Sequence, residues 1–337
     1  MSYLAGHWYV AAFIHEITTQ PIRRVLFDLP VVLYRTQDGQ AVALSDACPH
    51  RRAPLHLGRV IGNEIACPYH GLRFEPSGKC SHNPNFRDPT PNVRARRYAV
   101  VERHHMTWIW MGEADSATPT TVPDFSRLAA PDVKPVHGYL KINAREPLIS
   151  DNLLDLSHTE FLHPYLANDG FNSRLQQDVR QDGDTVFSLY SIANEPMTPL
   201  LAQLWDKDPI THADMRFHMR WEPPSCLLLE VGATAPGRAG AEGVTAYVSH
   251  LLTPETATST HYFWTFARDS RKGDQQFDAH LQASISQAFL NEDAPIIEWQ
   301  ERYEQLPDSN PPARHFLRGD AGAARARRVV EKLKSGG

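Results

Sequence analysis

The sequence predicts an α+β protein in two parts, an all-β N-terminal domain over residues 1–120 followed by an α+β domain over residues 121–337. Short apolar runs broken by turn residues fill the first 110 residues. A segment of linker composition follows at residues 115–123 and places the boundary between about 115 and 140. Beyond it, segments with helical spacing alternate with longer strand-like runs, as expected for a sheet that carries helices.

The N-terminal part contains short strands joined by tight turns. The turn pairs Asp38-Gly39, Gly62-Asn63 and Ser77-Gly78 are typical of connections between antiparallel strands. The apolar runs that they separate are residues 8–12, 31–34, 41–44 and 108–111. We therefore expect an antiparallel all-β domain.

The second part mixes helices with a sheet. One helix is expected over residues 149–162, where Pro164 ends or bends it. A long helix is expected over residues 277–304, with a kink or two abutting helices at Pro295, and a basic amphipathic helix over residues 321–333. The clearest strand-like runs are residues 186–190, 227–231, 244–248 and 260–264.

Composition and charge exclude several classes of protein. A formal charge of -5 and a sequence pI near 6.4 provide no basic surface for nucleic acid. The first residues lack the basic start and apolar run of a signal peptide, and no stretch reaches the ~18 apolar residues of a membrane span. We therefore expect a cytoplasmic protein without a nucleic-acid or membrane partner. Four cysteines are too few and too scattered for a disulfide framework.

Two of the cysteines lie in paired motifs that suit a metal. Cys48-Pro49-His50 and Cys67-Pro68-Tyr69-His70 each join a thiol to an imidazole across a proline turn. Three interpretations compete: a zinc site with two Cys and two His, a Rieske [2Fe-2S] cluster with two Cys on one iron and two His on the other, and chance. The mixed pairs favour the cluster, because each loop can then give one ligand to each iron. The repeated proline and the following Gly71 argue against chance.

A second set of metal-ligating residues lies on the expected mid-chain helix, which carries Asn152, Asp155, His158 and His163. On a regular helix His163 lies about 140° round from His158, so both reach one ion only if the helix is distorted or ends between them. Pro164 makes this possible. Two His and one distant carboxylate form the facial triad of non-haem Fe(II) oxygenases, which leaves sites open for O2 and substrate. In a chain with 17 His, the alternative is two ordinary histidines; the cluster favours iron, because its electrons need an acceptor.

Motifs spread over the whole chain carry a resemblance to one family. Beside the two cluster motifs they are Trp8-Tyr9-Val10-Ala11, Trp108-Ile109-Trp110, Asp151-Asn152-Leu153-Leu154-Asp155, Pro223-Pro224-Ser225 and Leu252-Thr253-Pro254-Glu255-Thr256. With these motifs the chain resembles the oxygenase components of vanillate and dicamba O-demethylases, which are Rieske non-haem iron oxygenases. The resemblance implies a Rieske domain followed by a helix-grip-like catalytic domain that holds mononuclear iron.

The resemblance also implies the third ligand of that iron. Asn291-Glu292-Asp293 resembles the Glu-Asp pair of these demethylases, whose Asp completes the triad, so the role passes to Asp293. Glu292 is the fallback. On a regular helix the two carboxylates point about 100° apart, so only one of them can serve.

An electron path is implied as well. By resemblance, Asp155 bridges His70 of one chain and His158 of its neighbour through hydrogen bonds that orient both rings. Asn152 is a second catalytic candidate on the same segment. A head-to-tail contact of this kind closes into a ring, and the usual assembly of the family is a homotrimer.

The implied activity is reductive activation of O2 on a small aromatic substrate. Electrons come from NADH through a separate flavin and iron-sulfur reductase, or a ferredoxin plus reductase, since this chain has no Gly-rich nucleotide-binding motif. The leading expectation is O-demethylation of a methoxylated, vanillate-like aromatic acid with release of formaldehyde. Aryl-methyl hydroxylation, N-demethylation and ring or polycycle hydroxylation are alternatives at the same site. A Rieske electron-transfer protein is the alternative outside the oxygenases.

Substrate contacts follow from the resemblance alone. His250 falls where dicamba demethylase has a substrate-contacting His, the alternative being a hydrogen-bonded histidine at a strand end. Leu229 falls where that enzyme has a polar pocket residue, which argues against dicamba itself as the substrate. Arg216 and Arg220 are candidates to pair with a substrate carboxylate, although arginines on strands are more often solvated.

Overall fold

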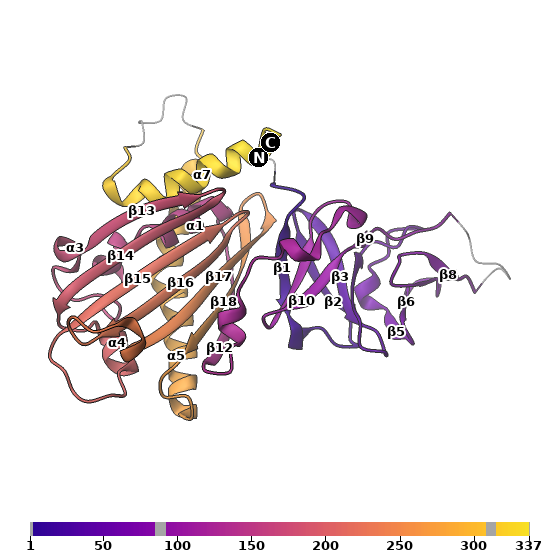
Figure 1. The fold of residues 1–337 in the computed structure, drawn as a ribbon. Helices are drawn as coiled ribbons and strands as arrows, with labels where there is room; N and C mark the ends of the chain where they lie inside the picture. Colours follow the sequence, from indigo (N-terminus) through magenta and orange to yellow (C-terminus); the bar gives the residue numbers. More distant parts are fainter. Residues whose placement is uncertain (1–2, 85–91, 308–314, 337) are drawn as a thin grey trace. The chain divides into compact units, whose positions relative to one another are not determined.

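Three small antiparallel sheets build the N-terminal unit of the computed structural model, which describes residues 3–84, 92–307 and 315–336 (Figure 1). This unit contains Met1–Pro123 and also Thr253–Ala257. Its strand orders are β1-β11-β10, β2-β3-β4-β9 and β5-β6-β7-β8. The strands are β1 Trp8–Phe13, β2 Ile22–Leu26, β3 Leu29–Arg35, β4 Ala41–Ser45, β5 Arg59–Ile61, β6 Glu64–Ala66, β7 Arg73–Phe74, β8 Cys80–His82, β9 Arg97–Tyr98, β10 Val100–Arg103 and β11 Met106–Trp110.

The predicted all-β character of this unit is confirmed. All four predicted strands form, as β1, β3, β4 and β11. The three predicted turns lie between β3 and β4, β5 and β6, and β7 and β8. Their glycines, Gly39, Gly62 and Gly78, have φ values of 95°, 63° and 79°, a region that glycine enters without steric cost.

The segment of linker composition is ordered. It forms two 3-10 turns, Ala114–Ser116 and Pro119–Thr121. The indole Nε1 of Trp8 donates to the Thr118 carbonyl at 3.1 Å and to Thr121 Oγ1 at 3.2 Å. The segment is therefore held against β1, within the N-terminal unit.

The second unit, Asp124–Leu252 with Thr258–Gly337, is built on one seven-stranded sheet. The strand order is β12-β18-β17-β16-β15-β14-β13; β12 pairs antiparallel with β18, and each neighbouring pair from β13 to β17 is antiparallel. The strands are β12 Lys134–Ile142, β13 Gln176–Asp182, β14 Thr185–Glu195, β15 Ala213–Glu222, β16 Cys226–Thr234, β17 Val244–Thr256 and β18 Ser259–Arg268. Figure 1 shows this sheet with helix α7 lying beside β13 and β14.

Helices cover one face of the sheet. Alternate residues of the strands share a single apolar core with α1, α5, α6 and α7, so these helices pack on the same face. The predicted α+β class is confirmed. The α-helices are α1 Glu146–Leu154, α2 Thr159–Leu162, α3 Phe171–Arg174, α4 Pro199–Leu204, α5 Gln275–Ala288, α6 Ala294–Glu304 and α7 Ala321–Lys334. Among the described residues no helix has the length and apolar character needed to cross a membrane.

The single helix expected over residues 149–162 is wrong. Helix α1 ends at Leu154, and a 3-10 turn, Leu156–His158, precedes the short α2. Asp155 is extended, with φ -113° and ψ 103°, and its Oδ1 accepts the Ser157 amide at 2.9 Å. The Leu154 carbonyl accepts the Tyr190 hydroxyl from the sheet at 3.2 Å, so a tertiary contact replaces the helical one. Helix α2 ends at Leu162, and His163 is non-helical with φ -126° and ψ 78°, which allows the rings of His158 and His163 to face one point.

The long C-terminal helix is interrupted before its proline. A π-helical turn, Phe289–Asp293, separates α5 from α6, and the Ala294 amide donates to the Phe289 carbonyl five residues back. The expected kink is therefore a π turn that ends just ahead of Pro295. Such single turns inside α-helices occur mostly at functional sites.

Strand β12 is not among the predicted strands. Gly138 lies in its centre, opposite Trp264 of β18. A Cβ at this position would come within 2.2 Å of the Trp264 indole, so only glycine lets the ring lie over the strand. Glycine and proline in Lys134–Ile142 lower the strand propensity, and tertiary packing overrides it.

Candidate metal centres and substrate cavity

The two Cys/His motifs lie on loops with the same backbone conformation. One follows β4 and the other joins β6 to β7. The Arg52 amide donates to the Cys48 carbonyl at 2.7 Å, and the Gly71 amide donates to the Cys67 carbonyl at 3.1 Å. Each donor is four residues beyond its cysteine and has positive φ, 57° at Arg52 and 71° at Gly71. Each loop thus turns back on itself and presents one thiol and one imidazole.

The two thiols lie against each other, and so do the two imidazole rings. Cys48 and Cys67 are 1% and 4% exposed, and their thiols are in contact. Burial, aided by the Cys67 thiol, raises the pKa of Cys48 to about 11, so a bound cation is needed to hold it as thiolate. The rings of His50 and His70 lie 4.8 Å apart between centroids, and the His50 ring is exposed. Inner thiols and outer imidazoles fit a Rieske cluster.

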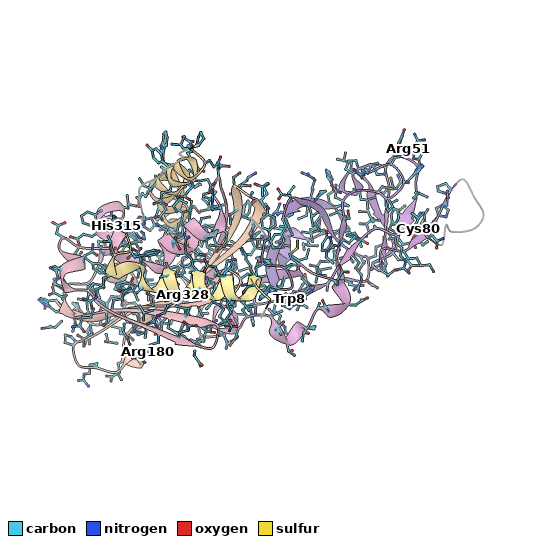
Figure 2. The ribbon with its side chains drawn as sticks, turned by 90° about the horizontal axis from the view of Figure 1, so that it is seen from above. Trp8, Arg51, Cys80, Arg180, His315 and Arg328 are labelled. Atoms are coloured by element: carbon cyan, nitrogen blue, oxygen red, sulfur yellow. The ribbon has the colours of Figure 1, made fainter. Side chains whose placement is uncertain are left out.

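Of the two remaining cysteines, Cys80 shares an apolar core with Cys48 and Cys67, and Cys226 belongs to the second unit. Figure 2 labels Arg51, which extends from the first loop into solvent, and Cys80, which lies on β8 of the same unit. Cys80 and Cys226 are buried and form no disulfide, and burial raises the pKa of the Cys226 thiol well above its usual range. Both are packing residues.

Three side chains of the second unit converge on one point. His158 Nε2 lies 3.5 Å from Asp293 Oδ1, and His163 Nε2 lies 3.1 Å from the same oxygen. The ligand atoms of the three residues all lie within 4.8 Å of one another. His163 and Asp293 are each 3% exposed, while His158 is partly buried. Two imidazoles and one carboxylate at this spacing fit a non-haem Fe(II) site.

The other nitrogen of each ring is already occupied. His158 Nδ1 donates to the backbone carbonyl of Asp155 at 2.6 Å, and His163 Nδ1 lies 2.5 Å from Glu292 Oε2. Because these oxygens accept hydrogen bonds, both protons belong on Nδ1 and both Nε2 atoms carry the free lone pair. Metal-ligating histidines are generally oriented in this way.

Burial and charge act differently on the two rings. Burial lowers the pKa of His158, and the Asp293 carboxylate opposes this only in part. Burial alone would also lower the pKa of His163, but Asp293 and Glu292 on its two sides raise it. The pKa of His163 thus depends more on neighbouring carboxylates than the pKa of His158 does.

The structure assigns different positions to the two neighbouring carboxylates. Asp293 faces Nε2 of His163, where the other donors meet, whereas Glu292 faces Nδ1 of the same ring. The π turn carries both, so neither replaces the other. From the sequence, Glu292 is expected only as a fallback ligand. Its contact with His163 Nδ1 is signalled in the sequence only by its position next to Asp293.

Asn152 and Asp155 lie around these donors. Asn152 Nδ2 donates to Asp293 Oδ1 at 3.1 Å. Within one chain, His158 meets the backbone oxygen of Asp155, and the carboxylate instead accepts the Ser157 amide. Gly319, just before α7, lies against that carboxylate, where a Cβ would come within 2.5 Å of it.

A cavity of about 380 Å³ opens onto the three donors. Its sheet wall is one face of β15 to β18, and helices α1 and α5 contribute the opposite side. His250 lies in this wall, 4% exposed, with Nδ1 2.6 Å from the Tyr262 hydroxyl. Its Nε2 is buried and has no hydrogen-bond partner among the described residues. The volume suits a substituted aromatic ring.

Arg216 and Arg220 do not line the cavity within the described part of the chain. They alternate along β15 with the core residues Phe217 and Met219 and therefore point to the other face. Arg216 Nε pairs with Glu230 at 2.6 Å, and Arg220 Nε pairs with Glu222 at 2.8 Å. Their candidate role as partners of a substrate carboxylate is not supported.

An all-β unit with paired Cys/His loops, together with a His/His/Asp set in the cavity of a helix-covered antiparallel sheet, defines a Rieske-type non-haem iron oxygenase. Comparisons with known proteins agree. Residues 7–98 match the Rieske [2Fe-2S] domain, and residues 142–335 match the vanillate O-demethylase oxygenase C-terminal domain.

Relatives match over almost the whole chain. The oxygenase component of dicamba O-demethylase from Stenotrophomonas maltophilia is 33% identical over 335 residues, covering 99% of this chain and 98% of the relative. A crystal structure of dicamba monooxygenase with 3,6-dichlorosalicylic acid has a TM-score of 0.94 at 33% identity, covering 99% and 98% of the two chains. A second, with non-haem iron and dicamba, has a TM-score of 0.90 at 31% identity over the same shares.

The chain therefore belongs to the Rieske oxygenase family of the vanillate and dicamba O-demethylase oxygenase components. It is a monooxygenase of the oxidoreductase class, and its cofactors are a Rieske [2Fe-2S] cluster and a mononuclear iron. As an oxygenase component it works with a separate electron-transfer protein. The predicted family, fold and cofactors are confirmed.

Proposed function

We propose that this oxygenase removes the methyl group of an aromatic methoxy substituent. The observation that carries the proposal is the convergence of His158, His163 and Asp293 donor atoms within 4.8 Å of one another beside an apolar cavity. Three protein ligands on one side of an Fe(II) leave positions for O2 and substrate on the other. The similarity to an O-demethylase over 99% of the chain supports the reaction type.

The cluster is assigned to the four residues of the paired loops. Cys48 and Cys67 hold one iron, and His50 and His70 hold the other. The contact between the buried thiols and the 4.8 Å separation of the ring centroids support this division.

When bound, the mononuclear iron supplies reductive activation of O2 with electrons that the cluster provides one at a time. The protein side chains prepare that site. Glu292 and the Asp155 carbonyl retain the two Nδ1 protons, and Asn152 holds the Asp293 carboxylate. The apolar walls keep bulk water from the reacting methyl group.

The reaction inserts one oxygen atom into a C–H bond of the methoxy group. The hemiacetal that forms releases formaldehyde and leaves a phenol. One O2, two electrons and two protons are consumed, and the second oxygen atom leaves as water. His250 Nε2, buried and free of a partner among the described residues, is proposed to hydrogen-bond the substrate.

Partners follow from the same proposal. The electrons originate from NADH through a flavin and iron-sulfur reductase, or a ferredoxin plus reductase, and the chain acts in the cytoplasm, where NADH is supplied. We propose a homotrimer in which Asp155 connects His70 of one chain to His158 of the next. The Asp155 carbonyl already holds His158 at 2.6 Å, which supports the receiving end of this path.

Metal analysis and spectroscopy of the purified protein test the proposal. We expect about three irons and two acid-labile sulfides per chain, with the reduced-state EPR signal of a His-ligated cluster. Addition of reductase, NADH and methoxyarenes should then release formaldehyde. An iron content that remains at two per chain after anaerobic Fe(II) addition would instead indicate an electron carrier. Zinc without sulfide would exclude both the oxygenase and the electron carrier.

A further inference from the structure

The cavity has no fixed positive charge among its described lining residues. The sheet wall beside His250 consists of apolar side chains, namely Phe217, Met219, Leu229, Val231, Val248 and Phe266. They share one face because β15, β16 and β17 pair in register, with Met219 opposite Leu229 and Leu229 opposite Val248. A carboxylate placed here would lose its hydration without gaining an ion pair.

The nearby arginines are committed elsewhere. Arg216 and Arg220 pair with glutamates on the other face of the sheet. Arg271 reaches the Gln203 carbonyl at 3.1 Å, but its other terminal nitrogen pairs with Asp274 at 2.6 Å and its guanidinium stacks on Phe277. His280 on α5 lines the cavity from an exposed position, where solvent screens any charge.

The metal site does not supply the missing charge. Its side chains include two carboxylates, Asp293 as candidate ligand and Glu292 against His163. Two carboxylates balance a divalent iron, so the site as a whole is close to neutral toward a bound molecule. An anionic substituent therefore finds no electrostatic attraction at this end either.

His250 offers one uncharged hydrogen-bonding atom. Its environment holds the ring neutral, because burial lowers its pKa to about 3. Nδ1 is taken by the Tyr262 hydroxyl, which leaves Nε2 for a ligand. A neutral carbonyl, amide or hydroxyl group satisfies this atom without burying a charge.

We infer that the substrate is an uncharged, mostly apolar aromatic ether with one hydrogen-bonding substituent, and that aromatic carboxylates are excluded. The inference rests on the proposed function and narrows its substrate class. It departs from the aromatic acid that family resemblance suggests, since Leu229 and its neighbours leave nothing in the wall to pair with an acid.

Two probes of equal size test the inference, 3-methoxybenzamide and 3-methoxybenzoate at pH 7.5. Their binding is measured by calorimetry on protein reconstituted anaerobically with Fe(II) and without reductase, so no turnover is needed. The amide should bind at least ~100-fold more tightly than the acid, because the acid buries an unpaired carboxylate. Formaldehyde release with reductase is then measured separately for both.

A gain-of-charge variant sharpens the test. Leu229→Arg places a cation on the cavity face and should improve the affinity for the benzoate relative to the amide by at least ~10-fold. Leu228→Arg is the matched control, because the adjacent residue of β16 points to the opposite face. It should leave the ratio unchanged.

Benzoate binding as tight as amide binding in the unmodified protein would overturn the inference, as would a failure of every neutral ether to bind. Tight amide binding without formaldehyde release would support the neutral substrate class and contradict O-demethylation. The two proposals thus fail by different readouts. If Leu229→Arg does not fold, the comparison in the unmodified protein still decides.

Discussion

Glu292 Oε2 lies 2.5 Å from Nδ1 of His163, while Asp293 lies on the other side of the same ring. The imidazole is thus held between consecutive residues of the chain. One carboxylate fixes its tautomer, and the other shares the point where the metal donors meet. Each contact leads to a separate prediction.

Removing the Glu292 contact should weaken iron binding without removing a ligand. We expect Glu292→Leu to lower Fe(II) affinity by about 10- to 100-fold, as is usual when the partner of a ligating histidine is lost. Glu292→Gln retains an acceptor for the Nδ1 proton and should lose much less. Competition with a chelator measures both affinities. Equal losses would show that the charge of Glu292, and not its hydrogen bond, is what matters.

Asp293→Asn should empty the mononuclear site and leave the cluster intact. The neutral amide is a far weaker ligand for a hard cation than a carboxylate. Iron should fall from about three to about two per chain with two sulfides retained. Formaldehyde release should be lost. Unchanged iron content and turnover would exclude Asp293 as the ligand.

His250 should make stability depend on acid pH. Burial lowers its pKa to about 3, against about 6.5 in an unfolded chain. Between these values the unfolded chain binds the extra proton, so stability falls as pH drops below about 6.5 and is flat above it. The double variant His250→Leu/Tyr262→Phe, which leaves no buried orphan hydroxyl, should lose less stability between pH 7 and pH 5. Thermal unfolding at both values measures this, and an unchanged pH dependence would contradict it.

A buried ion pair fixes α1 to α6. Arg145 Nε and Nη2 donate to the two Glu301 oxygens, each at 2.7 Å, and Glu301 is 2% exposed. Burial opposes ionisation of Glu301, but the hydrogen bonds from Arg145 lower its pKa overall. Glu301→Ala should cost about 3–5 kcal/mol, because Arg145 loses both charge-assisted hydrogen bonds to the buried carboxylate. The pair contributes above the unfolded pKa of ~4.3 and is lost as pH falls through the lower folded value.

Urea unfolding of the Glu301→Ala variant measures this cost. Because α1 carries Asn152 and α6 follows Asp293, iron affinity should fall as well. Asp132→Ala, which breaks an exposed pair with Arg127 and leaves that guanidinium over the Tyr247 ring, is the control and should change stability by less than ~1 kcal/mol. Equal losses of stability in the two variants would show that burial of the Arg145–Glu301 pair does not increase its contribution to stability.

Gly138→Ala should destabilise the second unit. The added methyl would come within 2.2 Å of the buried Trp264 ring, and overpacking of this kind costs about 1–3 kcal/mol. Gly273→Ala is the matched control, since no atom of the described residues lies within 4 Å of a Cβ built at this position. A similar unfolding temperature for both variants would contradict the close packing.

The features that could be predicted from the sequence are those determined by residues that lie close together along the chain. The Cys48 and Cys67 motifs depend on ligands a few residues apart, and the strands around them follow turns such as Asp38-Gly39, so both are readable from short stretches. His158 and His163 were also readable as a pair. Their roles as ligands, like those of Asp293 and His250, stay predictions until metal and substrate are measured.

Other features depend on contacts that no short stretch contains. Helix α1 stops because Tyr190 takes the Leu154 carbonyl, and β12 contains glycine because Trp264 needs the space. Neither partner lies within 30 residues of the segment that it changes. The position of Glu292 follows from a π turn, which differs from an α turn by a single hydrogen-bond shift and has no strong sequence signal.

The π turn at Phe289–Asp293 fits one residue more than an α-helix needs over the same path, so it is equivalent to an insertion. Loss of that residue would give a continuous and more regular helix from α5 to α6. It would also turn the residues after the deletion by about 100° around the helix axis relative to those before it, so the two carboxylates would no longer both face His163. A regular helix at this position would therefore be incompatible with the contacts that Glu292 and Asp293 make at the iron site. Among relatives, the length of this helix would distinguish oxygenases from proteins that have kept the fold and lost the chemistry.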